Sequence, residues 1–282
     1  MEQPAGNPAV GDASRPGPGG RPRTYKTEGV VLRAAAVLEA DRLITVLTPS
    51  LGKLKVTVRG ARRITSRLGG HLDVLNRVHL TLALGHRFDV VTGAESAESF
   101  ASIKSDLDRL ASALYLSELV DLLLPEAAPH SVAYDLLLSA LRSLDRAEPS
   151  EAVLRYVELR LLEDAGYMPE LQRCLVCGND LEPDHHRYAP ALGGTVDDRC
   201  VVAAGRVLPL SVDALKVLRH FARSGFAEAT RLRVGAELDA ELESVLGSSL
   251  QHVLEREMGT AGFVEHLRML RRRARRDERQ EK

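Results

Sequence analysis

The 282-residue chain is poor in aromatic residues: it has no tryptophan, and aromatics make up only 4% of the sequence. No stretch approaches the roughly 18 to 20 consecutive apolar residues that span a bilayer, and the Pro- and Gly-rich N-terminus lacks the apolar run of a signal peptide. Three cysteines, an odd number, argue against a disulfide framework. We therefore expect a cytoplasmic protein with no membrane partner.

The sequence also lacks the short motifs that build common catalytic sites. No histidine is followed two residues later by Glu, which a zinc centre of the cytidine-deaminase type requires. His-Glu-x-x-His, Gly-x-x-x-x-Gly-Lys-Ser/Thr and Gly-x-Ser-x-Gly are absent as well. We therefore predict that the protein is not an enzyme.

Acidic residues are missing from one long stretch, although the formal net charge is only −1. Between Arg42 and Leu72 there is no Asp or Glu, whereas protein surfaces usually intersperse both signs. The same stretch holds the residues that we predict to bind nucleic acid: Arg42, Lys53, Lys55, Arg59, Arg62, Arg63, Ser66 and Arg67. Several cations on one surface can follow a phosphate backbone.

From Lys26 to about Ser99 the pattern is typical of β-strands. Short runs rich in Val, Leu, Ile and Thr cover Gly29–Ala35, Leu43–Thr48, Leu54–Arg59, Val74–Leu84 and Phe88–Thr92. Alternation in the third run places Lys55 and Arg59 on one face and the valines on the other. Five short strands separated by turn signals suit a small barrel such as the OB-fold, although an SH3-like barrel has a similar pattern.

After Ser99 the apolar period becomes helical. Ser105 is the expected cap of a first helix, which ends at Pro125. Leu107, Leu110 and Leu114 form the apolar stripe of this helix. Further helices are predicted over about Ser131–Leu144, from Ser150 to Gly166, over Ser211–Arg223 and over Leu238–Met258, with a last helix beyond. The predicted fold class is α+β multidomain: an N-terminal OB-fold β-barrel, then an all-α domain with an embedded zinc-ribbon-like segment.

The predicted boundaries follow these changes of pattern. They are a disordered extension (1–24), an OB-fold domain (25–99), a first helical part (100–172), a zinc-ribbon-like insert (173–204), a second helical part (205–268) and a basic tail (269–282).

The cysteines are spaced like the knuckles of a zinc ribbon. Cys174 and Cys177 form one pair, and after nineteen residues Asp197 and Cys200 form the other, with Asp where a cysteine is expected. The sequence therefore predicts a structural zinc site of Cys174, Cys177, Asp197 and Cys200, with His185 or His186 as an alternative fourth ligand. A ribbon held by packing alone, without metal, is the other interpretation.

At this point the residues resemble those of the RecO family. The likeness extends from about Thr24 to Phe263. In the barrel it rests on Gly29-Val30-Val31-Leu32, Glu39, Asp41, Thr48, Gly52-Lys53, Gly60-Ala61-Arg62-Arg63, Ser66-Arg67 and Ala94-Glu95. Further on it rests on Arg155-Tyr156-Val157-Glu158-Leu159, Leu162, Gly166-Tyr167-Met168-Pro169, Cys174, Cys177-Gly178, Tyr188 and Gly193-Gly194.

The resemblance implies a nucleoid-associated mediator of recombinational DNA repair. RecO-like proteins bind single- and double-stranded DNA, anneal complementary strands and, with RecR, load RecA onto strands coated by single-strand-binding protein, whose C-terminal tail is an expected partner. Asp197 departs from the family pattern and puts the metal in question. An RNA-binding or transcription-associated protein built from the same two modules is the alternative hypothesis, because phosphate contacts alone do not distinguish the two sugars.

Overall fold

The computed structural model describes residues 24–37, 41–61, 69–126, 128–146, 150–183 and 185–258. The predicted basic tail, the last predicted helix and all but one residue of the predicted N-terminal extension lie outside these ranges. Two compact units make up the chain: Met1–Glu98 together with Glu126–Ser131, and Ser99–Pro125 together with Val132–Lys282. No helix in the described ranges has both the length and the apolar character to cross a membrane.

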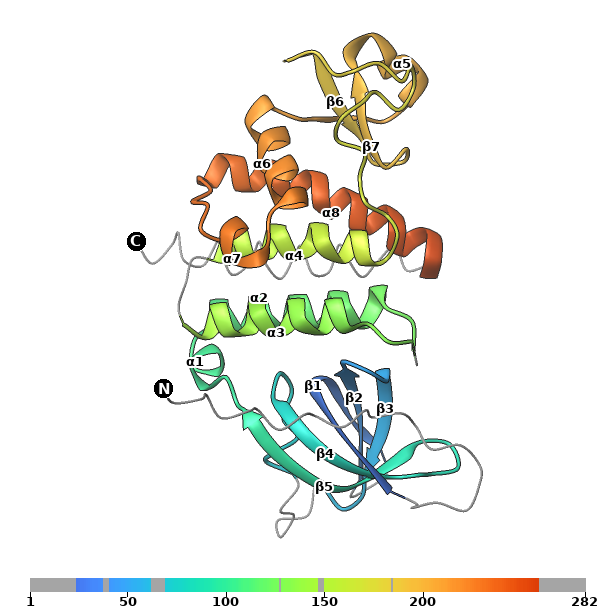
Figure 1. Ribbon diagram of the computed structural model, residues 1–282, viewed down its shortest axis with the longest axis vertical. Helices are drawn as coiled ribbons and strands as arrows, with labels where there is room; N and C mark the ends of the chain where they lie inside the picture. Colours follow the sequence, from blue (N-terminus) through green and yellow to red (C-terminus); the bar gives the residue numbers. More distant parts are fainter. Residues whose placement is uncertain are drawn as a thin grey trace, which may run out of the picture. The chain divides into compact units, whose positions relative to one another are not determined.

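The first unit contains a closed barrel of five strands in the order β1-β2-β3-β5-β4 (Figure 1). The strands are β1 Thr24–Val37, β2 Asp41–Thr48, β3 Gly52–Val58, β4 Arg77–Ala83 and β5 Asp89–Glu98. All neighbours pair antiparallel except β3 and β5, which run parallel. A five-stranded closed barrel in this order is an OB-fold, so the predicted fold is confirmed.

The long strand β1 closes the barrel because it belongs to two pairings. Its first half pairs with β4 and its second half with β2, and the register with β2 shifts between Val31 and Arg33. Such an irregularity bends a strand and increases its twist. At Gly29 a Cβ atom would lie only 2.6 Å from the carbonyl oxygen of Leu47, so the crossing requires a residue without a side chain. The enclosed core is apolar throughout, with Ile44, Val56 and similar residues.

The segment before β4 differs from the prediction. The apolar run from Val74 was expected to be strand from its start, but β4 begins only at Arg77. Leu75 has a positive φ of 73°, and its backbone N–H donates to the carbonyl oxygen of Val31. Leu75 is fully buried. It therefore contributes to the core from a turn, which the periodicity of side chains cannot reveal.

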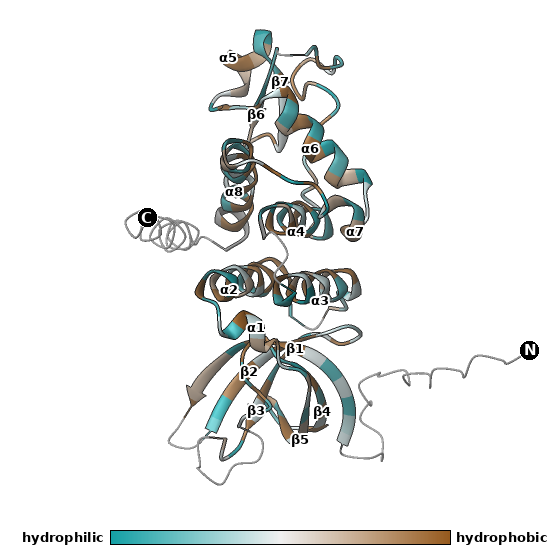
Figure 2. Ribbon diagram, turned by 90° about the vertical axis from the view of Figure 1, so that its left-hand side faces the viewer, coloured by the Kyte–Doolittle hydropathy of each residue, from teal (hydrophilic) through white to brown (hydrophobic). Residues whose placement is uncertain are grey.

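The second unit is mainly helical (Figure 2). Its helices are α1 Ala101–Lys104, α2 Leu107–Leu123, α3 Ser131–Asp145, α4 Ser150–Asp164, α6 Val212–Arg223, α7 Phe226–Ala229 and α8 Ala236–Met258. Figures 1 and 2 show α2 and α3 side by side, with α4 and α8 in the next layer. The predicted helices that fall within the described residues are confirmed, with ends that differ by a residue or two.

Two predictions for α2 are wrong in detail. The N-cap is Asp106 rather than Ser105, because the Asp106 carboxylate accepts hydrogen bonds from the backbone N–H groups of Asp108 and Arg109. The expected stripe does not face the core, since Leu107 is 76% exposed and Leu114 41% exposed. The buried residues are Ala113, Leu116, Ser117, Leu119 and Val120. Leucines surround this helix on several sides, so the apolar pattern does not identify the packed side.

A small three-stranded sheet lies between α4 and α6 in the sequence, with the order β7-β6-β8. Its strands are β6 His186–Ala189, β7 Gly194–Asp197 and β8 Leu208–Pro209, and the short helices η1 Asp198–Cys200 and α5 Val201–Ala204 follow β7. A small apolar core holds this segment together, formed by Cys174, Ala189, Val196 and Ala204. It corresponds to the predicted zinc-ribbon-like insert.

A buried ion cluster connects three helices of the second unit. Arg155 on α4 is fully buried, and its guanidinium donates to Glu158 at 2.7 and 2.9 Å and to Asp239 on α8 at 3.0 Å. The hydroxyl of Tyr115 on α2 donates to Glu158 at 2.6 Å. Burial lowers the pKa of Arg155, but the carboxylates of Glu158 and Asp239 outweigh it and raise the pKa above its usual value.

We predict that Arg155→Met destabilises the protein by about 3 to 5 kcal/mol, because removal of one partner leaves buried carboxylates without compensation. The control is Arg173→Met, since the Arg173 side chain is 68% exposed and pairs with the exposed Asp180. This control is expected to cost less than about 1 kcal/mol. Urea unfolding of both variants measures the difference, and equal small losses would contradict the assigned role of the cluster.

Candidate nucleic-acid interface and metal centre

The outward row of β3 carries two of the predicted DNA-binding cations, and a third, Arg59, follows directly after the strand ends at Val58. Lys53, Lys55 and Arg59 alternate with the inward residues Val56 and Val58, which are buried in the barrel core. Lys55 and Arg59 are exposed. Lys55 thus lies on the face of β3 opposite the valines, whereas Arg59 lies in the turn after the strand, and its place on the same face stays a prediction.

Lys53, by contrast, is only 7% exposed. The contact between β3 and β5 covers just Val56 with Asp89 and Thr57 with Val90, which leaves the first half of β3 without a partner on that side. Glu126 forms a β-bridge with Lys53 there, and the backbone of Ala128 lies beside Gly52. Lys53 therefore does not project freely from the strand, as a phosphate contact requires.

Glu126 also supplies an acidic partner for Lys55 on the outer face of β3. The ammonium group of Lys55 forms an ion pair with the carboxylate of Glu126, and the two side chains are 38% and 55% exposed. Elsewhere on the barrel, Arg77 on β4 donates to Glu28 and Glu98, each at 2.8 Å. Positive charge is thus offset over part of the barrel surface.

Arg42 lies on a different row from Lys55 and Arg59. It shares its side of β2 with the core residues Ile44 and Val46, and at the end of the barrel it lines a hollow of about 400 Å³. In the register it is opposite Val58, next to Arg59. Arg42 and Arg59 therefore both lie at the open end of the β2–β3 hairpin, on different rows, while Lys53 lies near the turn and Lys55 lies between the two ends.

A hydrogen bond to β2 holds the backbone where the chain leaves β3. The carboxylate of Asp41 accepts a hydrogen bond from the backbone N–H of Gly60 at 2.8 Å, and Gly60 has a positive φ of 64°. The remaining predicted contacts follow directly in the sequence. Arg62, Arg63, Ser66 and Arg67 lie outside the described residues.

The predicted cysteines come together in the second unit. The sulfur atoms of Cys174, Cys177 and Cys200 all lie within 4.8 Å of one another. Burial raises the pKa of Cys174, but hydrogen bonds from the backbone N–H groups of Asp197 and Cys177 outweigh it and lower the pKa to about 7. Desolvation raises the pKa of Cys200 to about 11. This sulfur cluster fits three of the four ligands of a zinc ion.

The prediction that Asp197 supplies the fourth ligand is not supported. Both oxygens of its carboxylate accept hydrogen bonds from the Arg199 guanidinium, at 3.0 and 3.1 Å, and one also accepts the Arg199 backbone N–H at 2.8 Å. The side-chain hydrogen bond from Arg199 is the main reason why the pKa of Asp197 falls to about 2. Only the backbone N–H of Asp197 faces the cluster, with a hydrogen bond of 3.3 Å to the Cys174 sulfur.

The alternative ligands do not join the cluster either. The His185 side chain is 66% exposed and lies 3.8 Å from the Asp198 carboxylate. His186 is buried, and its Nδ1 lies 3.3 Å from the carbonyl oxygen of Glu182. Among the described residues, no His, Asp or Glu brings a ligand atom within the spacing of the three sulfurs.

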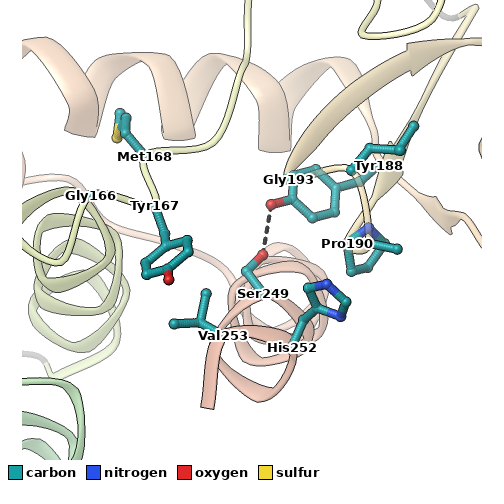
Figure 3. Close-up of a pocket in the computed structure, with 11 residues that line it drawn as sticks. Gly166, Tyr167, Met168, Tyr188, Pro190, Gly193, Ser249, His252 and Val253 are labelled. Carbon is teal, nitrogen blue, oxygen red and sulfur yellow. Dashed lines mark hydrogen bonds between the residues drawn. The ribbon is translucent and has the colours of Figure 1, made fainter. Parts of the chain in front are cut away.

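A cavity of about 230 Å³ lies between the small sheet and α8 (Figure 3). Tyr188 and Ser249 form a hydrogen bond of 2.6 Å at its wall, and burial raises the pKa of Tyr188 to about 12. Tyr167, His252 and Val253 also line the cavity. Its walls carry no group of cations, so the cavity offers nothing to a phosphate backbone.

Two family models together match almost all of the described chain. The model described as Recombination protein O N terminal matches residues 23–100, and the one described as Recombination protein O C terminal matches residues 104–260. The chain belongs to the RecO family. Its division into a barrel and a helical unit follows the two matched regions.

Curated members of the family are similar over nearly their whole length. A protein of Roseiflexus sp. named DNA repair protein RecO is 37% identical over 252 residues, which cover 89% of each chain. Proteins of the same name from Dehalococcoides mccartyi and Symbiobacterium thermophilum are 34% and 32% identical, with 88% of this chain and 98% and 99% of their own chains covered.

Two residues that shape these sites were not expected from the sequence. Glu126 lies about seventy positions from Lys55 in the chain, and nothing in the local pattern around Pro125 indicates that it returns to the barrel. The sequence does contain a signal for Arg199, because a cation two residues after an acidic knuckle position can fold back onto the carboxylate. Both residues neutralise a charge that the sequence predicts to bind a ligand.

We predict that Gly52→Ala destabilises the barrel unit by at least about 1 to 2 kcal/mol, the cost of a left-handed conformation for a residue with a side chain. Gly52 has a φ of +70°, and an added Cβ atom would also collide with the carbonyl oxygen of Ala128. The matched control is Gly70→Ala, where the new Cβ atom meets nothing within 4 Å. Urea unfolding compares the two, and equal stability would contradict the close approach of Glu126–Ser131.

Proposed function

We propose that this member of the RecO family is a non-enzymatic mediator of recombinational DNA repair that binds DNA through its barrel. The relatives carry the name DNA repair protein, which supports the process. The OB-fold supports the binding mode, because barrels of this kind bind oligonucleotides. One observation carries the location: β3 lies inside the acid-free stretch, and the exposed Arg59 directly after it leads into the cation-rich residues 62–67.

The proposed contact surface lies at the Arg42 end of the β2–β3 hairpin. Arg42 and Arg59 are neighbours there, and the anchored Gly60 starts the segment that carries the remaining cations. The proposed phosphate contacts are Arg42, Lys55, Arg59, Arg62, Arg63, Ser66 and Arg67. Lys53 contributes to the positive field, but its burial favours a structural role at the β3 edge.

The aromatic residues of the barrel are already engaged. The hydroxyl of Tyr25 donates to Asp89 at 2.6 Å, and the guanidinium of Arg87 lies 5.2 Å from the centre of the Phe88 ring. Base stacking therefore contributes little, and phosphate contacts dominate. A binder of this kind accepts single- and double-stranded DNA regardless of sequence, as annealing of complementary strands requires.

A structural zinc ion belongs to the same proposal. Cys174, Cys177 and Cys200 would hold it, and the ion would crosslink the two knuckles of the small sheet. We also propose the family's partners for this chain: RecR, the C-terminal tail of single-strand-binding protein and, indirectly, RecA. The proposed location is the cytoplasm, in association with the nucleoid.

Arg62→Glu combined with Arg63→Glu is expected to remove most of the DNA affinity and to leave the thermal unfolding midpoint nearly unchanged. The reason is that two phosphate contacts are lost and two repulsive charges are introduced. The charge-matched control is Arg231→Glu with Arg233→Glu, two exposed residues of the helical unit. Fluorescence anisotropy with a labelled single strand measures the affinity. Wild-type binding by the barrel variant would place the interface elsewhere.

Glu126→Gln is expected to strengthen DNA binding roughly two- to fivefold, since release of Lys55 from an exposed ion pair corresponds to about 0.4 to 1 kcal/mol. With about four phosphate contacts, the slope of log affinity against log salt on single strands is roughly −3, and one further contact steepens it by about 0.7. Salt titrations of the wild type and the variant measure both quantities.

The control for the Glu126 experiment is a double-mutant cycle with Lys55→Ala. If the gain comes from Lys55, Glu126→Gln has no effect when Lys55 is absent. Glu228→Gln, an exposed change of equal charge in the helical unit, is expected to leave affinity unchanged. A gain of equal size in Glu228→Gln would show that net charge, rather than the ion pair, controls the affinity.

Strand annealing tests the mediator function itself. The protein is expected to anneal complementary DNA strands, also when they are coated by single-strand-binding protein. Competition with RNA of the same sequence is the second measurement. A clear preference for RNA, together with no annealing of DNA, would favour the transcription-associated alternative over DNA repair.

A further inference from the structure

Within the part of the chain that the structure describes, the sulfur cluster offers a metal ion three ligands rather than four. Cys174, Cys177 and Cys200 have their sulfur atoms within 4.8 Å of one another. A zinc ion in a structural site takes four ligands, whereas sites with three protein ligands keep the fourth position for a molecule from solution. The identity of the fourth ligand therefore decides which type of site this is.

Asp197 is the residue at the expected fourth position, and Arg199 holds it away from that role. The guanidinium occupies both carboxylate oxygens in a fork, the geometry in which such pairs are strongest. The Asp197 side chain is 3% exposed and the Arg199 side chain is 71% exposed, so the carboxylate is shielded from water while the guanidinium reaches it from the surface. Arg199 is itself held by Glu182 at 3.2 Å. To ligate a metal, the Asp197 carboxylate would have to give up both contacts.

The cluster is accessible from solution on its outer side. Cys177 is exposed and Cys200 is partly exposed. Three apolar side chains near the cysteines in the sequence are also exposed: Leu175 and Val176 at 41% each, and Val202 at 97%. Small molecules can reach a metal ion held here, and apolar surroundings favour a thiol or an imidazole over a strongly hydrated anion.

We propose that a metal ion held by Cys174, Cys177 and Cys200 takes its fourth ligand from outside the chain, as a water molecule that a small thiol or imidazole can replace. This inference rests on the proposed metal site and goes beyond it, because it assigns an exchangeable position to a site that otherwise has only a structural role. The Arg199–Asp197 pair is the feature that keeps the position exchangeable.

Cobalt substitution of the full-length protein tests the proposal. One equivalent of Co²⁺ is added to metal-free protein, and the thiolate-to-cobalt charge-transfer band reports binding by the cysteines. Imidazole and, separately, 2-mercaptoethanol are then titrated. The expected result is a saturable shift of the cobalt d–d bands in the wild type. The spectrum of Asp197→Ala before titration is expected to match that of the wild type.

Two variants change the fourth ligand by design. Asp197→Cys supplies a fourth thiolate, so its d–d bands are expected not to respond to either titrant. Arg199→Ala releases the Asp197 carboxylate, and the half-saturating imidazole concentration is expected to rise about tenfold, in the range seen when outer-shell partners of metal sites are changed. His186→Ala is the control for the buried histidine next to the site and is expected to leave the wild-type spectrum unchanged.

Three results would overturn the proposal. The first is a wild-type spectrum that does not respond to the titrants, and the second is a change of that spectrum in Asp197→Ala or His186→Ala, since either residue would then be a ligand. The third is the absence of a charge-transfer band, which would remove the metal site as well. Binding of DNA by the barrel is measured separately on the same samples, so a failure here is distinguishable from a failure of the proposed DNA-binding function.

Discussion

The parallel contact between β3 and β5 closes the barrel over only two residue pairs, and the arrangement of the candidate interface depends on this constraint. The first half of β3 is left with an open edge, and exposed edges of this kind are normally covered. Glu126–Ser131 covers it here, which buries Lys53 and brings an acidic side chain to Lys55. Arg42 and Arg59 lie at the opposite end of the β2–β3 hairpin, away from this acidic side chain.

Pairing of neighbouring charges also decides which ligands are available at the sulfur cluster. A carboxylate beside a potential metal site can bind the metal or an arginine. Here the Asp197 carboxylate pairs with Arg199, which offers it a fork of two donors. In both places an ion pair between neighbouring groups removes a charge from the set available to a ligand. The proposed activities thus depend on which charges are paired inside the protein as well as on how many there are.

In the helical unit the buried charges have a different role. Arg155 and its carboxylate partners connect α4 with α8, and Tyr115 extends the cluster to α2. Since α4 is buried on nearly all sides, its neighbours must satisfy every polar group it carries. The cluster contains no group that contacts the small sheet or the sulfur atoms in the described contacts, and we assign it to the architecture of the helices.

The sequence alone determined a small five-stranded barrel, the positions of most helices and the grouping of the three cysteines, because strand alternation, helical periodicity and knuckle spacing are local signals. The strand pattern left an SH3-like barrel open, and the strand order of the structure is that of an OB-fold. The tertiary structure decided the rest. It showed that Lys53 is buried, that Leu75 joins the core from a turn, and that Arg199 takes the carboxylate of Asp197. Burial and the pairing of charges depend on residues far apart in the chain, such as Lys55 and Glu126, and no local pattern of residues encodes which of them meet.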